Sequence, residues 1–146
     1  MRTATVEPLG CGREYRGQVV SPEVHSDEAV RLLRDDYLLF APDLIWAEFG
    51  NVLWKKWRRR EIQADVARRI MEDFLRFPLE VRSSDTLLPT AWTIAEEFHR
   101  TMYDSLYLAL AESQGYRLVT ADQRFYNSLK ESRLGPMLLR VEDLPS

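Results

Sequence analysis

The stretch between residues 101 and 125 constrains the fold of this chain more than any other. It predicts an apolar helix with Asp104 as its N-cap and Gly115 as its C-cap residue. Residues 118–120, Leu-Val-Thr, then form a short run typical of a buried strand, and Asp122 lies just past it. The stretch is therefore a complete helix-to-strand unit with a carboxylate at each end.

The dimensions of this unit place its two aspartates at the same level. A helix of about eleven residues rises roughly 16 Å, and about five strand residues return by roughly the same distance. Asp104 and Asp122 are therefore expected at one edge of a sheet. In an open parallel sheet this is the edge formed by the carboxyl ends of the strands, where ligands normally bind.

A purely structural role is the alternative for both residues. Asp104 could act only as a helix cap, and Asp122 could cap a short helix over residues 124–129 in the same way. A third acid that has no capping role would favour a functional site, and Glu48 is the candidate.

The size and composition of the chain predict one soluble domain. Its 146 residues, 45% of them apolar, can build a single core. The single cysteine, Cys11, excludes an internal disulfide and a multi-cysteine metal site, which suits a reducing compartment. Neither a membrane-length apolar run nor a signal peptide is evident, so we expect a cytoplasmic protein with no membrane contact.

Strand and helix patterns alternate along most of the chain. Residues 1–21 show neither period and predict an irregular segment, followed by a domain over residues 22–146. The absence of hairpin signals within the alternation predicts a three-layer α/β/α sandwich with a central parallel sheet. Helices are expected from Pro22 to Asp36, from Pro42 to Arg59, over 61–77 and over 86–100, and strands over 38–41, 79–82 and 137–141.

Glu48 is an unusual residue in the predicted helix from Pro42 to Arg59. The first three turns of this helix are almost wholly apolar, so we expect it to be buried on most sides. Burying an unpaired carboxylate is costly, which favours a function for Glu48. Pairing with Lys55 or with nearby arginines is the structural alternative.

A block of basic residues follows on the same helix. Lys55, Lys56 and residues 58–60, all arginine, interleave with Trp54 and Trp57 in a chain of net charge −3. The favoured interpretation is a solvated helix C-terminus that complements the helix dipole. The weaker alternative is a surface that contacts phosphates and stacks bases.

Convergence of Glu48, Asp104 and Asp122 would create a metal site. Like charges in close proximity need a cation to neutralise them, and an all-oxygen donor set suits Mg²⁺ or Mn²⁺ rather than Zn²⁺. A hard cation of this kind activates water against a phosphodiester. Thr120 could orient a carboxylate, although a buried strand threonine is the commoner explanation.

Three segments of the chain resemble the PIN domain family, of the small bacterial type found as VapC toxins. They are residues 41–54 (APDLIWAEFGNVLW), 103–111 (YDSLYLALA) and 118–125 (LVTADQRF), and the likeness extends over residues 22–144. The resemblance implies a PIN-like α/β/α fold and a Mg²⁺-dependent ribonuclease that is commonly dimeric and inhibited by a cognate antitoxin protein. Carried over by position, Glu48, Asp104 and Asp122 are the catalytic and metal-binding acids.

The chain departs from the family at its beginning. The family opens with a strand that ends in an aspartate, expected here at about Gly12, and no such segment is present. Codons permitted for residues 9–20, read one base later, can encode Leu-Val-Val-Asp-Ala-Ser-Thr-Ala-Val-Lys-Trp-Phe, which resembles that opening. We therefore hypothesise a frameshift, and a stop codon in the shifted frame of the coding DNA would refute it.

Two functions follow from these observations. The first is a metal-dependent ribonuclease, the toxin of a toxin–antitoxin pair, with weakened metal binding because one acid is missing. The alternative is a non-catalytic PIN-like module that engages an antitoxin or a partner subunit.

Overall fold

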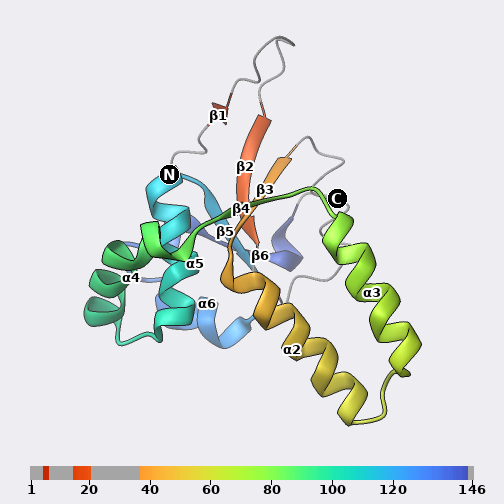
Figure 1. Ribbon diagram of the computed structural model, residues 1–146. Helices are drawn as coiled ribbons and strands as arrows, with labels where there is room; N and C mark the ends of the chain where they lie inside the picture. Colours follow the sequence, from red (N-terminus) through yellow and green to blue (C-terminus); the bar gives the residue numbers. More distant parts are fainter. Residues whose placement is uncertain (1–4, 7–14, 21–36, 145–146) are drawn as a thin grey trace.

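The computed structural model describes residues 5–6, 15–20 and 37–144, which form a parallel α/β fold (Figure 1). The helix expected from Pro22 to Asp36 lies outside the described residues. The strands are β1 (Thr5–Val6), β2 (Tyr15–Val20), β3 (Tyr37–Pro42), β4 (Leu79–Arg82), β5 (Arg117–Thr120) and β6 (Leu138–Arg140). The helices are α2 (Leu44–Arg58), α3 (Ala64–Arg76), α4 (Ser84–Phe98), α5 (Met102–Gln114) and α6 (Gln123–Leu129), with short 3₁₀ turns at η1 (Gly135–Met137) and η2 (Val141–Asp143).

The sheet confirms the predicted parallel architecture. Its strand order is β4-β3-β2-β5-β6, with every neighbouring pair parallel, and β1 pairs antiparallel with β2. In the centre, Val19 lies opposite Phe40 of β3 and Leu118 of β5. The carboxyl ends of all five parallel strands therefore meet at one edge, and α2, α4 and α6 begin close to that edge.

The expectation of irregular structure at the start of the chain is wrong for residues 15–20. They form β2, which occupies the centre of the sheet. Its sequence, Tyr-Arg-Gly-Gln-Val-Val, contains no apolar run or clear alternation that would predict a strand. The strand forms because β3 and β5 pair with it on both sides. Gln18 is only 2% exposed as a result. The frameshift hypothesis concerns the coding DNA and stays a prediction.

Apolar side chains cover both faces of the sheet, because successive strand residues point to opposite faces. Val19, Phe40 and Leu118 belong to the larger core, which also contains most of the buried residues of α4 and α5. Val20, Leu39 and Val119 belong to a second, smaller core with Val141 and Leu144. The sheet is therefore a buried layer between two cores.

Helix α5 is the most completely buried helix of the described part of the chain. Residues 105–111 are all buried, in contact with α4 and with the sheet. Its N-cap is Thr101, whose Oγ1 accepts a hydrogen bond from the backbone N–H of Asp104 at 3.1 Å. The prediction that Asp104 is the N-cap is therefore wrong, because the helix begins one turn earlier. Gly115 closes the helix at φ 67°, as predicted.

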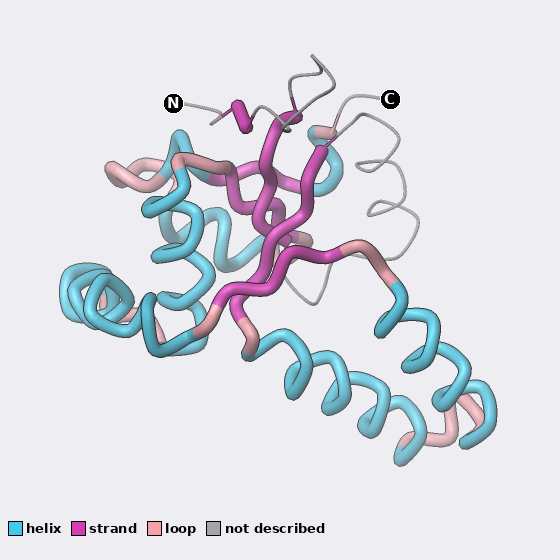
Figure 2. The backbone as a smooth tube through the Cα atoms, turned by 45° about the horizontal axis from the view of Figure 1, so that its top comes forward, coloured by secondary structure: helices cyan, strands magenta, loops and turns pink. Residues whose placement is uncertain are grey.

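Helices α2 and α3 form a hairpin that projects from the sheet (Figure 2). The two helices pack through Phe49 and Phe74, whose rings stack 3.7 Å apart, and through an edge contact of Trp46 with Phe74. The expectation that α2 is buried on most sides is wrong: only Ile45 and Leu53 are buried. A projecting hairpin has too few neighbours to cover its other apolar residues. Among the described residues, no helix is long and apolar enough to cross a membrane.

Arg133 connects α4, α5 and the loop after α6. It donates hydrogen bonds to both carboxylate oxygens of Glu97 at 2.9 and 2.6 Å, and to Glu112 Oε1 at 2.7 Å. The hydrogen bond from Arg133 holds the pKa of the Glu97 carboxyl below its ordinary value of 4.5. A carboxylate with a lowered pKa in the folded state stabilises the protein above its ordinary pKa, and this contribution disappears as the pH falls.

We therefore expect Glu97→Gln to flatten the acid dependence of stability. Between pH 5 and about pH 3 the melting temperature of the wild type should fall more steeply than that of the variant, because only the wild type loses the Glu97 ion pair. Thermal unfolding followed by circular dichroism measures both slopes. Parallel slopes for the two proteins would contradict this assignment.

Candidate active site at the carboxyl edge of the sheet

Asp122 lies in the turn between β5 and α6. The Thr120 hydroxyl, on a side chain that is buried, accepts a hydrogen bond from the backbone N–H of Asp122 at 3.0 Å. Asp122 Oδ1 in turn accepts from the backbone N–H of Phe125 at 3.0 Å, which makes Asp122 the N-cap of α6. The alternative that Asp122 caps this helix is confirmed, and the capping bond uses one of its two carboxylate oxygens.

Asp104 lies in the first turn of α5 and carries an ion pair. Its Oδ2 accepts a hydrogen bond from Nη2 of Arg100 at 2.8 Å, and both side chains are partly buried. The backbone N–H of Asp104 is the group that Thr101 caps. Its carboxylate is therefore not needed to cap the helix.

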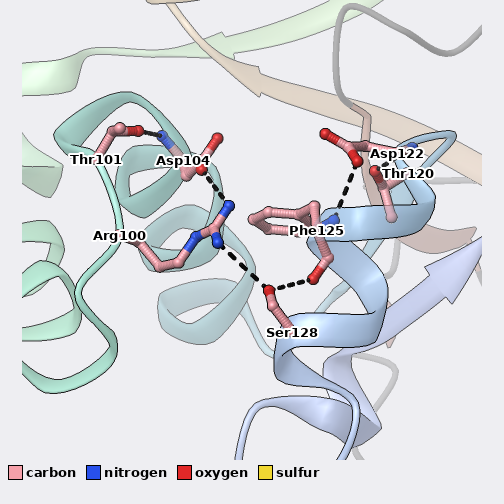
Figure 3. A network of polar contacts seen from close by, with 7 residues as sticks. All are labelled: Arg100, Thr101, Asp104, Thr120, Asp122, Phe125 and Ser128. Atoms are coloured by element: carbon pink, nitrogen blue, oxygen red, sulfur yellow. Dashed lines mark hydrogen bonds and ion pairs between the residues drawn. The ribbon is translucent and has the colours of Figure 1, made fainter.

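Arg100 bridges the elements that carry the two aspartates (Figure 3). Besides its bond to Asp104, its Nη1 lies 3.4 Å from Ser128 Oγ, and its guanidinium carbon lies 5.1 Å from the centre of the Phe125 ring. Ser128 Oγ donates to the carbonyl of Phe125 at 2.7 Å. Sequence reasoning missed Arg100, although a basic residue four positions before an acid at a helix start is a recognisable pairing signal.

The guanidinium of Arg100 is only partly satisfied. Its Nε atom is buried and has no hydrogen-bond partner among the described residues. A charged donor held in this way is under-solvated, which strengthens its attraction to the neighbouring carboxylate of Asp104. Arg100 therefore supplies positive charge beside Asp104, one of the three acids that the sequence predicts as metal ligands.

Glu48 projects from the second turn of α2 toward α5. Its Oε1 accepts a hydrogen bond from the Tyr107 hydroxyl at 2.7 Å, and the Tyr107 side chain is 5% exposed. Tyr107 follows Asp104 by three residues, so the two lie on the same side of α5, one turn apart. The fold thus brings Glu48 into contact with the helix that carries Asp104, one turn beyond that aspartate.

The three acids do not form a ligand group in the arrangement that the structure describes. Among residues 37–144 and the described strands before them, no three His, Cys, Asp or Glu side chains are placed to hold a metal ion. β2 also ends at Val20, so the central strand has no acid within its bounds. The donor chemistry fits a hard divalent cation, since all three side chains are carboxylates, but Asp104 is paired with Arg100.

The fold and the edge of the sheet near which the three acids lie indicate the class of protein. The open parallel sheet, with acidic side chains from α2, α5 and the end of β5 near its carboxyl edge, is an α/β domain with its candidate chemistry at the usual ligand-binding edge. A family model of the PIN domain matches residues 18–128. The chain therefore belongs to the PIN domain family, as the three sequence segments indicated.

Known relatives agree with this assignment. The chain is 35% identical over 105 residues to Ribonuclease VapC3 of Pyrobaculum aerophilum, covering 70% of this chain and 80% of the relative. The crystal structure of PAE2754 from the same organism superposes with a TM-score of 0.63 at 27% identity, covering 86% of this chain and 84% of that one.

Two more distant structures share the fold. A toxin–antitoxin complex from Klebsiella pneumoniae gives a TM-score of 0.57 at 12% identity, covering 87% of this chain and 99% of that one. VapBC2 from Rickettsia felis, bound to a promoter DNA fragment, gives 0.52 at 15% identity, covering 85% and 96%. The predicted PIN-like α/β/α fold is confirmed.

Proposed function

We propose that this chain is a metal-dependent ribonuclease and the toxin of a toxin–antitoxin pair. The observation that carries the proposal is its 35% identity to Ribonuclease VapC3 over most of both chains. The placement of Glu48, Asp104 and Asp122 near the carboxyl edge of the sheet supports it, because this is where such a domain would bind its substrate.

Each acid has a distinct role in the proposal. Glu48, Asp104 and Asp122 would hold Mg²⁺ or Mn²⁺, which supplies a positive charge that activates water and stabilises the leaving oxygen. Tyr107 would fix the orientation of Glu48 through its 2.7 Å hydrogen bond. Thr120 would fix the turn that presents Asp122.

Arg100 would act as the counter-ion of Asp104 while the site is metal-free. Its guanidinium neutralises the negative charge of the partly buried Asp104 carboxylate. Metal binding then requires Asp104 to exchange one cation for another, so the ion pair lowers the apparent metal affinity of the site.

The proposed partners are an RNA substrate, a cognate antitoxin protein and a second copy of the chain. Two of the structural relatives are described as a toxin–antitoxin complex and as VapBC2, which supports the antitoxin. A homodimer rests on the family resemblance. A cytoplasmic location follows from the same function.

The second candidate function is a PIN-like module that binds an antitoxin or a partner subunit without cutting RNA. The observation that favours it is the state of the acids: no ligand group is assembled among the described residues, and β2 contains no acid. A domain with an incomplete set of carboxylates could keep its binding surfaces and lose its chemistry.

Thermal unfolding with and without Mg²⁺ or Mn²⁺ separates the two functions. At a metal concentration of about 10–100 times the dissociation constant, binding adds about 1.4–2.7 kcal/mol of stability, or roughly 4–8 °C in melting temperature. Asp104→Asn should abolish this rise. Arg100→Met should lower the melting temperature without metal and reach the full rise at a lower metal concentration.

Two outcomes of this experiment would contradict metal binding at the proposed site. A rise that survives in Asp104→Asn would locate metal binding elsewhere on the chain. The absence of a rise in the wild type and in Arg100→Met would favour the non-catalytic module.

A further inference from the structure

We infer that the exposed basic face of α2 binds single-stranded RNA where the RNA extends away from the candidate active site. We call this surface the α2 track. This inference rests on the proposed ribonuclease function and deepens it by naming the binding surface. The α2 track consists of Lys55, Arg58 and Arg59 together with Trp54, all of which are exposed.

Helical spacing aligns this track with the candidate active site. Lys55 and Arg59 follow Glu48 by seven and eleven residues, so the three side chains lie on one face of the helix. The backbone N–H of Arg59 still bonds to the carbonyl of Lys55 at 3.0 Å, which keeps the helical geometry to that point. Glu48 and Arg59 are therefore about 16 Å apart along the axis, room for a few nucleotides.

The packing of the hairpin leaves this face uncovered by α3. Helix α3 contacts α2 through Trp46 and Phe49, which lie about 160° and 100° around the helix from Glu48. The Arg59 side chain is 70% exposed. The face that carries the cations is thus directed away from the helix that supports it.

One exposed tryptophan flanks the cations of the track: Trp54 lies about 120° around the helix from Glu48, next to Arg58 at about 80°. The Arg58 guanidinium lies 5.1 Å from the Trp54 ring centre, and Trp54 is 50% exposed. A half-exposed tryptophan beside arginines can stack a base while the cations contact phosphates.

The acids near the track do not cancel its charge. Glu61 lies 3.9 Å from Lys56 and 4.0 Å from Arg59, and these are long, exposed pairs of little strength. The chain as a whole is negative, at −3, so the positive charge is local to this helix. A polyanion with stackable bases fits the surface better than an acidic polypeptide, which could use the charges but not Trp54 as a stacking platform.

The test measures RNA binding without cleavage. A short fluorescein-labelled single-stranded RNA is titrated with the full chain in EDTA, at several salt concentrations, and binding is followed by fluorescence anisotropy. Lys55→Ala combined with Arg59→Ala should lower the slope of log affinity against log salt by about 1.4, since each phosphate contact on a single strand contributes about 0.7. Trp54→Ala should weaken binding by at least about fivefold.

Exposed residues outside the track offer controls for both changes. Arg68→Ala removes an exposed cation from α3, and Trp92→Ala removes an exposed tryptophan from α4. Both variants should bind RNA as the wild type does. Circular dichroism verifies that every variant is folded.

Several results would overturn the inference. The wild type could fail to bind RNA, the track and control variants could lose RNA affinity equally, or the track variants could bind RNA with unchanged affinity. A labelled poly-glutamate that loses affinity for the track variants while RNA does not would assign the surface to an acidic polypeptide instead.

The proposed function is tested separately by cleavage of the same RNA with Mg²⁺. Track-dependent binding without cleavage would support the track and refute the ribonuclease. Cleavage of the RNA, together with RNA binding that the track variants leave unchanged, would support the ribonuclease and refute the α2 track.

Discussion

Asp104→Asn is expected to slow Mg²⁺-dependent RNA cleavage by roughly a hundredfold or more. Residues that only orient a metal ligand already change affinity or activity by about 10–100-fold, and loss of a proposed ligand should cost at least as much. The substitution keeps the size of the side chain and leaves the Thr101 cap on the backbone N–H intact. Cleavage of a labelled RNA under single-turnover conditions measures the effect.

A matched acid on the same protein controls for the loss of negative charge. Asp73 is exposed on α3 and outside the candidate site, so Asp73→Asn should cleave RNA at the wild-type rate. If both variants cleave as the wild type does, Asp104 does not contribute to catalysis and its contact with Arg100 is structural. If both lose activity equally, the effect belongs to the overall charge of the protein.

Leu108→Ala is expected to lower the free energy of unfolding by about 3 kcal/mol, the largest stability effect that we predict. Leu108 is 0% exposed and lies in the middle of α5, within the larger core. Removing its side chain loses the transfer free energy of the buried methyl groups and leaves a cavity that α4 and the sheet cannot easily fill. The melting temperature should fall by about 6–12 °C.

Leu75→Ala makes the same chemical change at the surface. Leu75 is 62% exposed on α3, so this variant should unfold within about 0.5 kcal/mol of the wild type in chemical denaturation. A small effect at Leu108, or equal effects at both positions, would show that α5 is not the centre of the core.

The helix-to-strand unit around α5 could be predicted because its signals are local. The capping glycine at Gly115, the apolar run over residues 106–111 and the short strand after it depend on neighbours within a few residues. The error at its start was also local: Thr101 competed with Asp104 for the N-cap, and the hydroxyl of Thr101 accepts the capping bond. Residue type alone does not decide between two good capping residues three positions apart.

β2 could not be predicted because its stability is not local. Residues 15–20 lack both an apolar run and a strand period, and the strand exists through its pairing with β3 and β5, far away in the sequence. The same reason explains the wrong expectation for α2. Its apolar residues suggested burial, and only the tertiary structure shows that it projects as half of a hairpin.

The residues of the candidate site also fall into two groups, those that the sequence indicates and those that only the structure reveals. Residue type, spacing and the resemblance to PIN domains point to Glu48, Asp104 and Asp122 in the sequence, and their binding of a metal stays a prediction. Arg100, as the ion-pair partner of Asp104, and Tyr107, as the partner of Glu48, emerged only in the structure.

The sequence by itself therefore determined the alternation of strands and helices after residue 37 and the parallel α/β class, because periodicity and capping act over short distances, and it supplied the three acids of the proposed site as a prediction. Only the tertiary structure decided which strand lies at the centre, which faces of α2 are exposed and which side chains the acids contact. Those features depend on contacts between residues far apart in the chain, such as Glu48 and Tyr107, which no local pattern encodes.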